Sequence, residues 1–382
     1  MRSIRTGADG DPAQARRADD PASGATRGAL RTITTLDAHT AGEPLRIITG
    51  GFPEPQGTTM LERRRWLLAH ADPLRRLLMH EPRGHADMYG CLPTTPVSAT
   101  GDVGALFLHN EGSSTMCGHA IIALVTVGLE CGLFAVRDPE RIVIDTPAGA
   151  VIARAARDGT RVRRVSFTNV PSFVFARDLE VDVPGLGASA RPLRCDVAFG
   201  GAFYVYVSAA DVGIDLAAGS ERTPLSEIVA AARAIQAAVE PVLELRHPSG
   251  ATDLDYLYGV ILSEEVAVGD AERRRAARGR AITRRSRNVC VFADGEVDRS
   301  PTGTGVSGRI ALELERGAVA LGEPLVVESL VGTSFTVRAT SRTSVGELPA
   351  VVPEVSGSAY LTGEHRFFLQ PDDPFPGGFL LR

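Results

Sequence analysis

Two short segments, far apart in the chain, place small polar residues and glycine directly before a helix-like run. Residues 116–119 (MCGH) precede the apolar run 121–125, and residues 298–305 (DRSPTGTG) precede the run 306–312. Such a start presents unpaired backbone N–H groups and the positive end of a helix dipole to an anion. Positions 117 and 302 are 185 residues apart, close to half of the 382-residue chain. The sequence therefore predicts two similar halves whose helix N-termini face one small carboxylate.

The composition excludes several classes of function. The chain contains no lysine, so all 41 of its Lys+Arg residues are arginine. This absence excludes a lysine Schiff base, including pyridoxal phosphate anchored on lysine, and it excludes a P-loop. The net charge of −5 comes without any basic stripe, which argues against nucleic acid as a partner.

The cysteines and the apolar runs bear on the cellular compartment. The five cysteines (Cys91, Cys117, Cys131, Cys195, Cys290) are odd in number and scattered, without a C-x-x-C pair or zinc spacing. We therefore expect reduced thiols and a cytoplasmic location. No run of 18 apolar residues is present, and the N-terminal arginines precede no apolar segment, so we expect neither a membrane span nor a signal peptide.

The residue pattern predicts a mixed α/β protein of the α+β type with a mainly antiparallel sheet, because strand-like segments prevail and regular βαβ alternation is absent. Residues 1–30 have almost nothing to bury, and we expect a disordered leader there. Residues 31–193 should form a first half that contains the helix after Cys117. Residues 194–354 should form a second half that contains the loop of Asp298 and Thr302.

Local patterns predict individual elements. Residues 37–44 read as a polar turn between strands at 31–36 and 45–49. Residues 59–79 read as a helix interrupted at Pro73, and residues 84–94 as a loop. Residues 195–207 read as one strand, and residues 223–239 as a surface helix capped by Thr223. The helix after Cys117 is apolar on all sides as far as residue 127, so it must be wrapped on every side, and it should end near Gly132.

Cys117 is the strongest candidate for chemistry. A lone cysteine is usually a small buried hydrophobe, but this one stands at a helix N-terminus, where we expect a lowered pKa and a reactive thiolate. His119 has two open interpretations: a general base, or a residue that offers its backbone N–H to an anion while its ring packs. Asp298 is either a helix cap or a contact for a substrate ammonium group.

A second group of polar residues, Asp37, His39 and Glu43, has the composition of a metal site. No second cluster completes four ligands, so the stabilisation of a turn is the favoured interpretation.

Three segments together resemble the signatures of the proline racemase superfamily: residues 37–46 (DAHTAGEPLR), 116–119 and 298–305. The similarity runs from about residue 33 to the C-terminal strands. It implies a fold like that of diaminopimelate epimerase, with two pseudo-symmetric halves, each a barrel-like sheet around a central helix. The active site would lie between the halves, and residues 355–382 would return to the first. The resemblance further implies a small cyclic imino acid as substrate, no metal or organic cofactor, and a homodimer.

The chain departs from that family at one position. Where the racemases and epimerases have a second catalytic cysteine, this chain has Thr302. A threonine hydroxyl is too weak an acid or base to replace a thiol, so inversion by two bases should be lost. The Cys/Thr version of the site is similar to that of family members that remove water from trans-3-hydroxy-L-proline to give Δ1-pyrroline-2-carboxylate.

The resemblance also implies a role for each site residue. Cys117 would accept the α-proton, and Asp298 would hold the ring ammonium. The substrate carboxylate would bind backbone N–H groups of four residues: Gly118, His119, Gly303 and Thr304. Three alternatives remain: an epimerase or racemase of the same family, a cysteine hydrolase, and a non-catalytic protein that binds imino acids.

Overall fold

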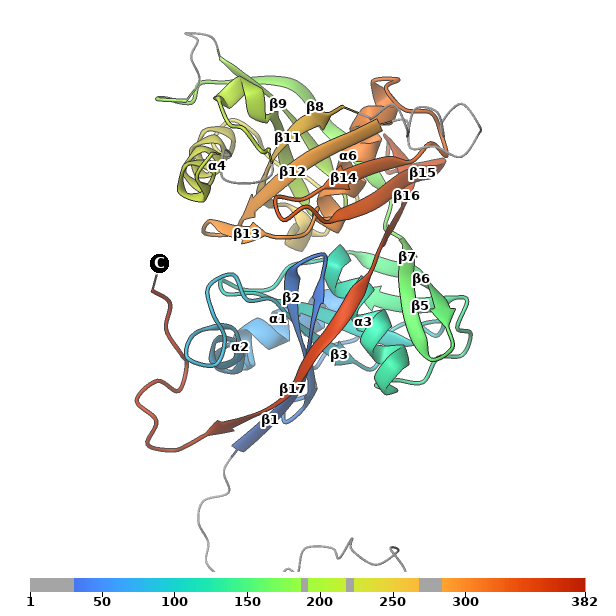
Figure 1. The fold of residues 1–382 in the computed structure, drawn as a ribbon, viewed down its shortest axis with the longest axis vertical. Coiled ribbons are helices and arrows are strands. Elements are labelled where there is room, and N and C mark those ends of the chain that lie inside the picture. Colours follow the sequence, from blue (N-terminus) through green and yellow to red (C-terminus); the bar gives the residue numbers. More distant parts are fainter. Residues whose placement is uncertain (1–30, 187–191, 218–222, 268–283, 382) are drawn as a thin grey trace, which may run out of the picture.

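The chain folds into two halves stacked on one another (Figure 1). The computed structural model describes residues 31–186, 192–217, 223–267 and 284–381, so the predicted leader lies outside the described residues. The first half contains β1 (Arg31–Thr40), β2 (Glu43–Gly50), α1 (Met60–His70), α2 (Asp72–Met79), β3 (Gly90–Thr94), β4 (Val103–Leu108), α3 (Gly118–Cys131), β5 (Ile142–Thr146), β6 (Gly149–Asp158), β7 (Arg161–Thr168) and β17 (Ala359–Leu369). The second half contains β8 (Ser172–Val181), β9 (Leu193–Phe199), β10 (Phe203–Ser208), α4 (Leu225–Val239), β11 (Leu257–Val266), β12 (Arg284–Phe292), β13 (Glu296–Asp298), α6 (Gly303–Glu315), β14 (Leu325–Glu328), β15 (Ser334–Val345) and β16 (Leu348–Gly357).

The two halves repeat one pattern of strand pairing. In the first half β2 lies parallel to β3, β3 antiparallel to β4, and β4 parallel to β5, after which β5, β6 and β7 form a meander. In the second half β10 lies parallel to β11, β11 antiparallel to β12, and β12 parallel to β14. Strands β14, β15 and β16 then form the corresponding meander. Helix α3 follows β4, and helix α6 follows β12 and β13. The predicted mixed α/β fold with two pseudo-symmetric halves is therefore confirmed.

Two strand connections cross between the halves. Strand β16 leads directly into β17, which descends to pair with β1 over its full length (Figure 1). In the opposite direction β7 leads into β8, which pairs with β9. The predicted limit at residue 193 assigned β8 to the first half, whereas this pairing joins β8 to the second.

Each half wraps its sheet around one apolar helix. Every residue of α3 from Gly118 to Gly128 is buried, and α3 ends where Gly132 adopts a left-handed conformation with φ of 69°. Burial of each large side chain in such a helix contributes about 1.5–3 kcal/mol to stability. Both the complete wrapping and the glycine stop were predicted. None of the helices in the described part of the chain is long and apolar enough to cross a membrane.

The N-termini of α3 and α6 meet at the junction of the halves. A β-carbon placed on Gly118 would lie 2.6 Å from the α-carbon of Gly303. A β-carbon placed on Gly303 would likewise lie 2.6 Å from the α-carbon of Gly118. Real side chains do not tolerate such a distance to backbone atoms, so both positions require glycine for close approach.

Several local predictions were wrong at strand ends. The segment 37–44 is not a long turn, because β1 and β2 extend through it and only Ala41 and Gly42 turn, with φ of 54° and 94°. The predicted loop 84–94 ends in β3, and β8 and β16 were missed. Prolines at positions 93, 349 and 353 argue against strands in β3 and β16, because proline has no N–H to donate to a sheet, and β8 does not alternate regularly between buried and exposed residues.

Two further elements need correction in the second half. The predicted strand 195–207 is two strands, β9 and β10, because Gly201 with φ of 110° reverses the chain. Helix α4 begins at Leu225 without a side-chain cap, and the Thr223 hydroxyl instead accepts a hydrogen bond from the backbone N–H of Asp215.

We predict that Gly118→Ala lowers the free energy of unfolding by about 1–3 kcal/mol, as overpacking does, because the new methyl group forces the two helix ends apart. Gly112→Ala is the matched control, since its nearest neighbour would be an atom of His109 at 4.0 Å. Urea unfolding measures both variants. Equal stabilities would contradict the close approach.

Candidate active site

The seven predicted site residues line one cavity between the N-termini of α3 and α6. Its walls contain Cys117, Gly118, His119, Asp298, Thr302, Gly303 and Thr304, together with Tyr89, Met116, Tyr204, Tyr258 and Phe292. The volume open to the centre of a water molecule is about 10 Å³, which is room for about one water. The cavity is therefore narrower than a cyclic imino acid, and its walls must move apart to hold one.

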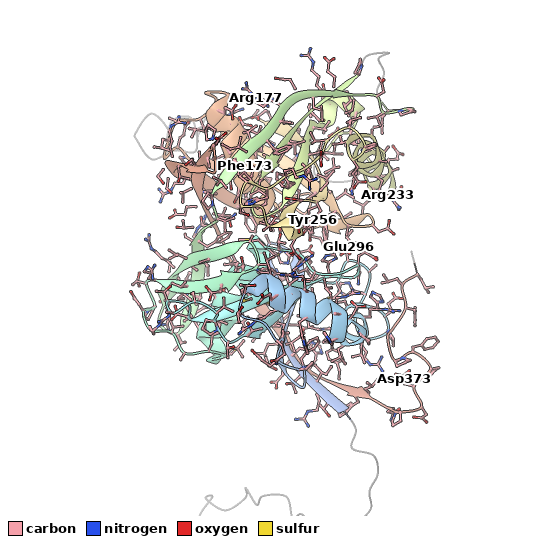
Figure 2. All side chains as sticks on the ribbon, turned by 180° about the vertical axis from the view of Figure 1, so that it is seen from behind. Phe173, Arg177, Arg233, Tyr256, Glu296 and Asp373 are labelled. Carbon is pink, nitrogen blue, oxygen red and sulfur yellow. The ribbon has the colours of Figure 1, made fainter. Side chains whose placement is uncertain are left out.

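Contacts between the halves surround the cavity. Glu296 and Tyr256 lie at the junction of the halves in Figure 2. The Glu296 carboxylate, fully buried, lies 3.0 Å from Nδ1 of His109 in the opposite half. The backbone N–H of Arg299 donates to the buried carboxylate of Glu43, also across the junction.

The helix ends present unpaired donors to the cavity. The first helical hydrogen bonds run from the N–H of Ile121 to the carbonyl of Cys117 and from the N–H of Val306 to the carbonyl of Thr302. The N–H groups that precede Ile121 and Val306, including those of the glycines that meet, therefore have no acceptor within their own helix. Both sets lie at the positive ends of helix dipoles, which makes the cavity a site for an anion.

Cys117 and His119 form a buried pair. The Cys117 sulfur lies 3.1 Å from Nδ1 of His119. Burial raises the pKa of the Cys117 thiol well above its usual range, Asp298 raises it further, and the backbone N–H of Ala120 lowers it only in part. The predicted low pKa at the helix end is therefore wrong for the closed site, because loss of water outweighs the helix. Burial also lowers the pKa of His119 to about 3, so its ring is neutral.

Asp298 is a buried carboxyl group on the opposite side of the junction. Burial raises its pKa to about 6, although a hydrogen bond from the backbone N–H of Ser300 favours the charged form. An ammonium group bound beside Asp298 would lower this pKa again and favour the charged carboxylate.

Thr302 is held in an unusual conformation. It caps α6 with φ of 63°, a value that costs a β-branched residue about 1–3 kcal/mol. Its buried hydroxyl makes no hydrogen bond of standard geometry, but it lies close enough to Asp298 and Cys290 to lower the pKa of both groups. The strained conformation holds this hydroxyl beside the Asp298 carboxyl group at the start of the helix.

Asp37, His39 and Glu43, whose composition resembles a metal site, have separate partners. Asp37 forms a buried ion pair with Arg46 at 2.8 Å, whereas the His39 ring accepts a hydrogen bond from the backbone N–H of Gly42. Within the described ranges, no three His, Cys, Asp or Glu side chains gather as a metal site.

An aromatic wall of the cavity was missed from the sequence. Tyr89 and Tyr258 share a hydrogen bond of 3.2 Å between their hydroxyls, and the Tyr258 ring stacks on Phe292. The Tyr204 hydroxyl lies 2.6 Å from that of Thr304. Aromatic residues in strands normally pack in a core, so nothing in their spacing separates a cavity wall from ordinary packing.

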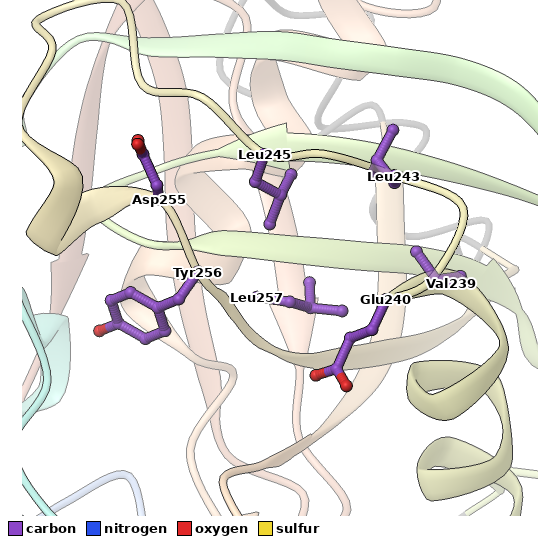
Figure 3. A pocket seen from close by; sticks show the side chains of 7 residues that line it. All are labelled: Val239, Glu240, Leu243, Leu245, Asp255, Tyr256 and Leu257. Atoms are coloured by element: carbon purple, nitrogen blue, oxygen red, sulfur yellow. The ribbon is translucent and has the colours of Figure 1, made fainter.

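Larger hollows lie elsewhere. One of about 260 Å³ lies between the end of α4 and the start of β11 (Figure 3). Its lining includes Glu240 and Asp255, but Asp255 already accepts a hydrogen bond from the backbone N–H of His247. It contains none of the predicted site residues, so volume does not identify the site here, whereas the convergence of reactive groups does.

Comparison with known proteins agrees with this geometry. A family model described as proline racemase matches residues 35–380. The chain belongs to the proline racemase family. It is 46% identical over 352 residues to the trans-3-hydroxy-L-proline dehydratase of Bacillus thuringiensis subsp. konkukian, and this match covers 92% of this chain and 98% of that protein. It is 42% identical over 353 residues to the 3-hydroxyproline 2-epimerase of Burkholderia multivorans, and this match covers 92% of this chain and 99% of that protein.

A solved structure shares the fold. The hydroxyproline epimerase of Agrobacterium vitis, with bound trans-4-hydroxy-L-proline, superposes with a TM-score of 0.79 at 28% identity. The match covers 92% of this chain and 95% of that one.

We predict that Thr302→Ala changes the free energy of unfolding by less than about 1 kcal/mol, because the lost hydroxyl makes no hydrogen bond of standard geometry and because removal of the β-branch relieves strain at φ of 63°. Thr304→Ala, the matched control, should cost about 1–3 kcal/mol, because it leaves the buried Tyr204 hydroxyl unpaired. Urea unfolding compares the two. Equal destabilisation by both variants would show that the Thr302 hydroxyl is as strongly bonded as that of Thr304 and would contradict the prediction.

We predict that Asp298→Asn stabilises the fold at pH 7 by about 3 kcal/mol, the cost of ionising a group whose pKa rises from 3.8 to about 6 on folding. The native state binds more protons than the unfolded state between these values. Wild-type stability therefore falls as pH rises through this window, and the advantage of the variant disappears below about pH 4.

Asp102→Asn is the control, and its expected effect on stability has the opposite sign, because folding lowers the pKa of Asp102. Hydrogen bonds from the backbone of Val143 and from Arg137 outweigh burial and lower the pKa of Asp102, so this variant should be less stable than wild type at pH 7. Thermal unfolding from pH 3 to pH 8 measures both. An advantage of Asp298→Asn that does not vary with pH would contradict this assignment.

Proposed function

We propose that this protein is a trans-3-hydroxy-L-proline dehydratase. The observation that carries the proposal is the chemistry of the cavity, in which Cys117 is the only thiol among the described lining residues and Thr302 stands at the start of the facing helix. A relative with 46% identity over nearly the whole chain bears this activity in its name. A homodimer and a cytoplasmic location stay predictions.

The substrate would be held at its two charged groups. Its carboxylate would accept hydrogen bonds from the N–H groups of Gly118, His119, Gly303 and Thr304, and both helix dipoles would stabilise the charge. Its ring ammonium would pair with Asp298. This pairing offsets the negative field of Asp298, which is one of the causes that raise the pKa of Cys117, so substrate binding itself favours the thiolate.

The reaction would begin with removal of the α-proton by the Cys117 thiolate. The electron pair left on the α-carbon is shared with the carboxylate, whose growing charge lies against the helix N-termini. This pair then forms the double bond to the neighbouring carbon as the 3-hydroxyl leaves. The enamine produced tautomerises to Δ1-pyrroline-2-carboxylate.

Inversion of configuration would need a second acid on the opposite face. Thr302 stands at that position, and its hydroxyl is too weak an acid to deliver a proton to a carbanion. Cys290 pairs in register with Asp298 on the neighbouring strand, but it is fully buried and does not line the cavity. These features favour elimination over epimerisation, the activity named for the Burkholderia multivorans relative.

The test is incubation of the purified protein with trans-3-hydroxy-L-proline, followed by proton NMR. We expect loss of the substrate and appearance of Δ1-pyrroline-2-carboxylate. Cys117→Ser should lower turnover at least about 100-fold, because the hydroxyl that replaces the thiol is a poor base.

Cys131→Ser, at an exposed cysteine outside the cavity, is the control and should keep wild-type turnover. Absence of product with the wild-type protein, or full activity of Cys117→Ser, would contradict the proposal.

A further inference from the structure

The elimination requires an acid that the proposed function leaves unassigned. Hydroxide is a poor leaving group, so the 3-hydroxyl must receive a proton as the carbon–oxygen bond breaks. Resting on the proposed function, we propose that His119 is this general acid. It delivers to the leaving hydroxyl the proton that it has taken from the Cys117 thiol.

The stereochemistry of the substrate determines on which face of the ring the acid must lie. In trans-3-hydroxy-L-proline the carboxylate and the hydroxyl lie on opposite faces of the ring. The α-hydrogen is opposite to the carboxylate at its own carbon, so the α-hydrogen and the hydroxyl lie on the same face. If Cys117 removes this hydrogen, the hydroxyl also points toward the Cys117 side of the cavity, and away from Thr302.

Two titratable side chains, His119 and Tyr89, contact Cys117 on that side. His119 is the better acid of the two, because burial raises the pKa of the Tyr89 hydroxyl well above its usual value. Its Nδ1 lies 3.1 Å from the sulfur and its Nε2 lies 3.7 Å from it, so the ring lies close alongside the thiol. The Tyr89 ring meets the His119 ring edge-on at 4.7 Å and fixes its plane. The ring is 2% exposed, so bulk water does not compete for the proton.

The other acidic groups of the cavity are less suited. Asp298 is occupied by the ring ammonium in the proposed complex. Burial raises the pKa of the Tyr89, Tyr204 and Tyr258 hydroxyls well above 10, which makes them weak donors. Burial disfavours a lone imidazolium ion, so the ring is charged only while it is paired with the Cys117 thiolate 3.1 Å away, and it then gives up its proton readily.

The protons and electrons balance over one turnover. The Cys117 thiol gives its proton to the neutral His119 ring, which forms a thiolate and an imidazolium ion beside the bound carboxylate. The thiolate takes the α-proton, and the electron pair of the broken carbon–hydrogen bond becomes the carbon–carbon double bond. The carbon–oxygen bond breaks with its electrons on oxygen, which takes the imidazolium proton and leaves as water. Thiol and neutral imidazole are restored without an oxidant or reductant.

The test compares two leaving groups in His119→Gln. Fluoride leaves as a weak base and needs little protonation, so trans-3-fluoro-L-proline undergoes the same elimination with little demand on the acid. We expect His119→Gln to lower water loss at least about 100-fold, within the usual range for a general acid. The rate of water loss relative to fluoride loss should fall at least about 10-fold from its wild-type value. An unchanged ratio would overturn the proposal, even if both rates fall.

His80→Gln is the matched control. His80 is also buried, but its ring contacts the backbone carbonyl of Asn110, and it does not line the cavity. This variant should keep the wild-type ratio of the two rates. If instead wild-type protein yields no product from trans-3-hydroxy-L-proline, the proposed function fails, which is a different result from an unchanged ratio.

A second measurement needs no variant. In cis-3-hydroxy-L-proline the hydroxyl lies on the face opposite to the α-hydrogen, out of reach of His119. We expect the wild-type protein to form no Δ1-pyrroline-2-carboxylate from this isomer under conditions in which the trans isomer is consumed. Product formation within about 10-fold of the trans rate would place the acid on the Thr302 side and overturn the proposal.

Discussion

The close approach of two helix N-termini is the constraint on which this structure depends. Gly118 and Gly303 meet without room for a β-carbon between them. Each helix end carries about half a positive charge, so the two ends repel one another until an anion lies between them. The fold resists this repulsion because both helices are wrapped by sheet and because buried polar contacts, such as His109 with Glu296, join the halves. The fold thus maintains a region of positive potential between the two helix ends, where the proposed function places the substrate carboxylate.

Burial determines the resting state of the reactive groups. The same exclusion of water keeps the Cys117 thiol and the His119 ring neutral and raises the pKa of Asp298. In the proposed complex a zwitterionic substrate would reverse this balance, because its ammonium would pair with Asp298 while its carboxylate would lie at the helix ends. The thiolate would then be favoured when substrate is bound.

The sequence predicted the parts of this arrangement that depend on local rules. Glycine after Cys117 and after Thr302, followed by apolar runs, was enough to predict both helix starts, and the carboxylate expected between them stays a prediction. Repetition of this motif at half the chain length predicted the two halves. These signals come from steric rules for glycine and from helix periodicity, which act over a few residues.

Other features depend on contacts that are distant in the chain. Tyr204 and Tyr258 come from β10 and β11 and Tyr89 from the loop before β3, and only the folded chain makes them one wall. The pKa of Cys117 was predicted with the wrong sign, because a helix end acts locally whereas loss of water depends on everything packed around it. Strand β8 was missed because its pairing with β9 and β16, rather than its residue pattern, makes it a strand.

The central claim is that Cys117 acts as a base on one face of the substrate and that Thr302 supplies no acid on the other. The measurement that tests it most directly uses trans-4-hydroxy-L-proline, which has no leaving group next to the α-carbon, in deuterium oxide. Proton NMR and chiral analysis then follow the α-hydrogen. We expect any α-deuterated product to retain the L configuration. Formation of cis-4-hydroxy-D-proline would show that a second acid serves the opposite face and would contradict the proposed mechanism.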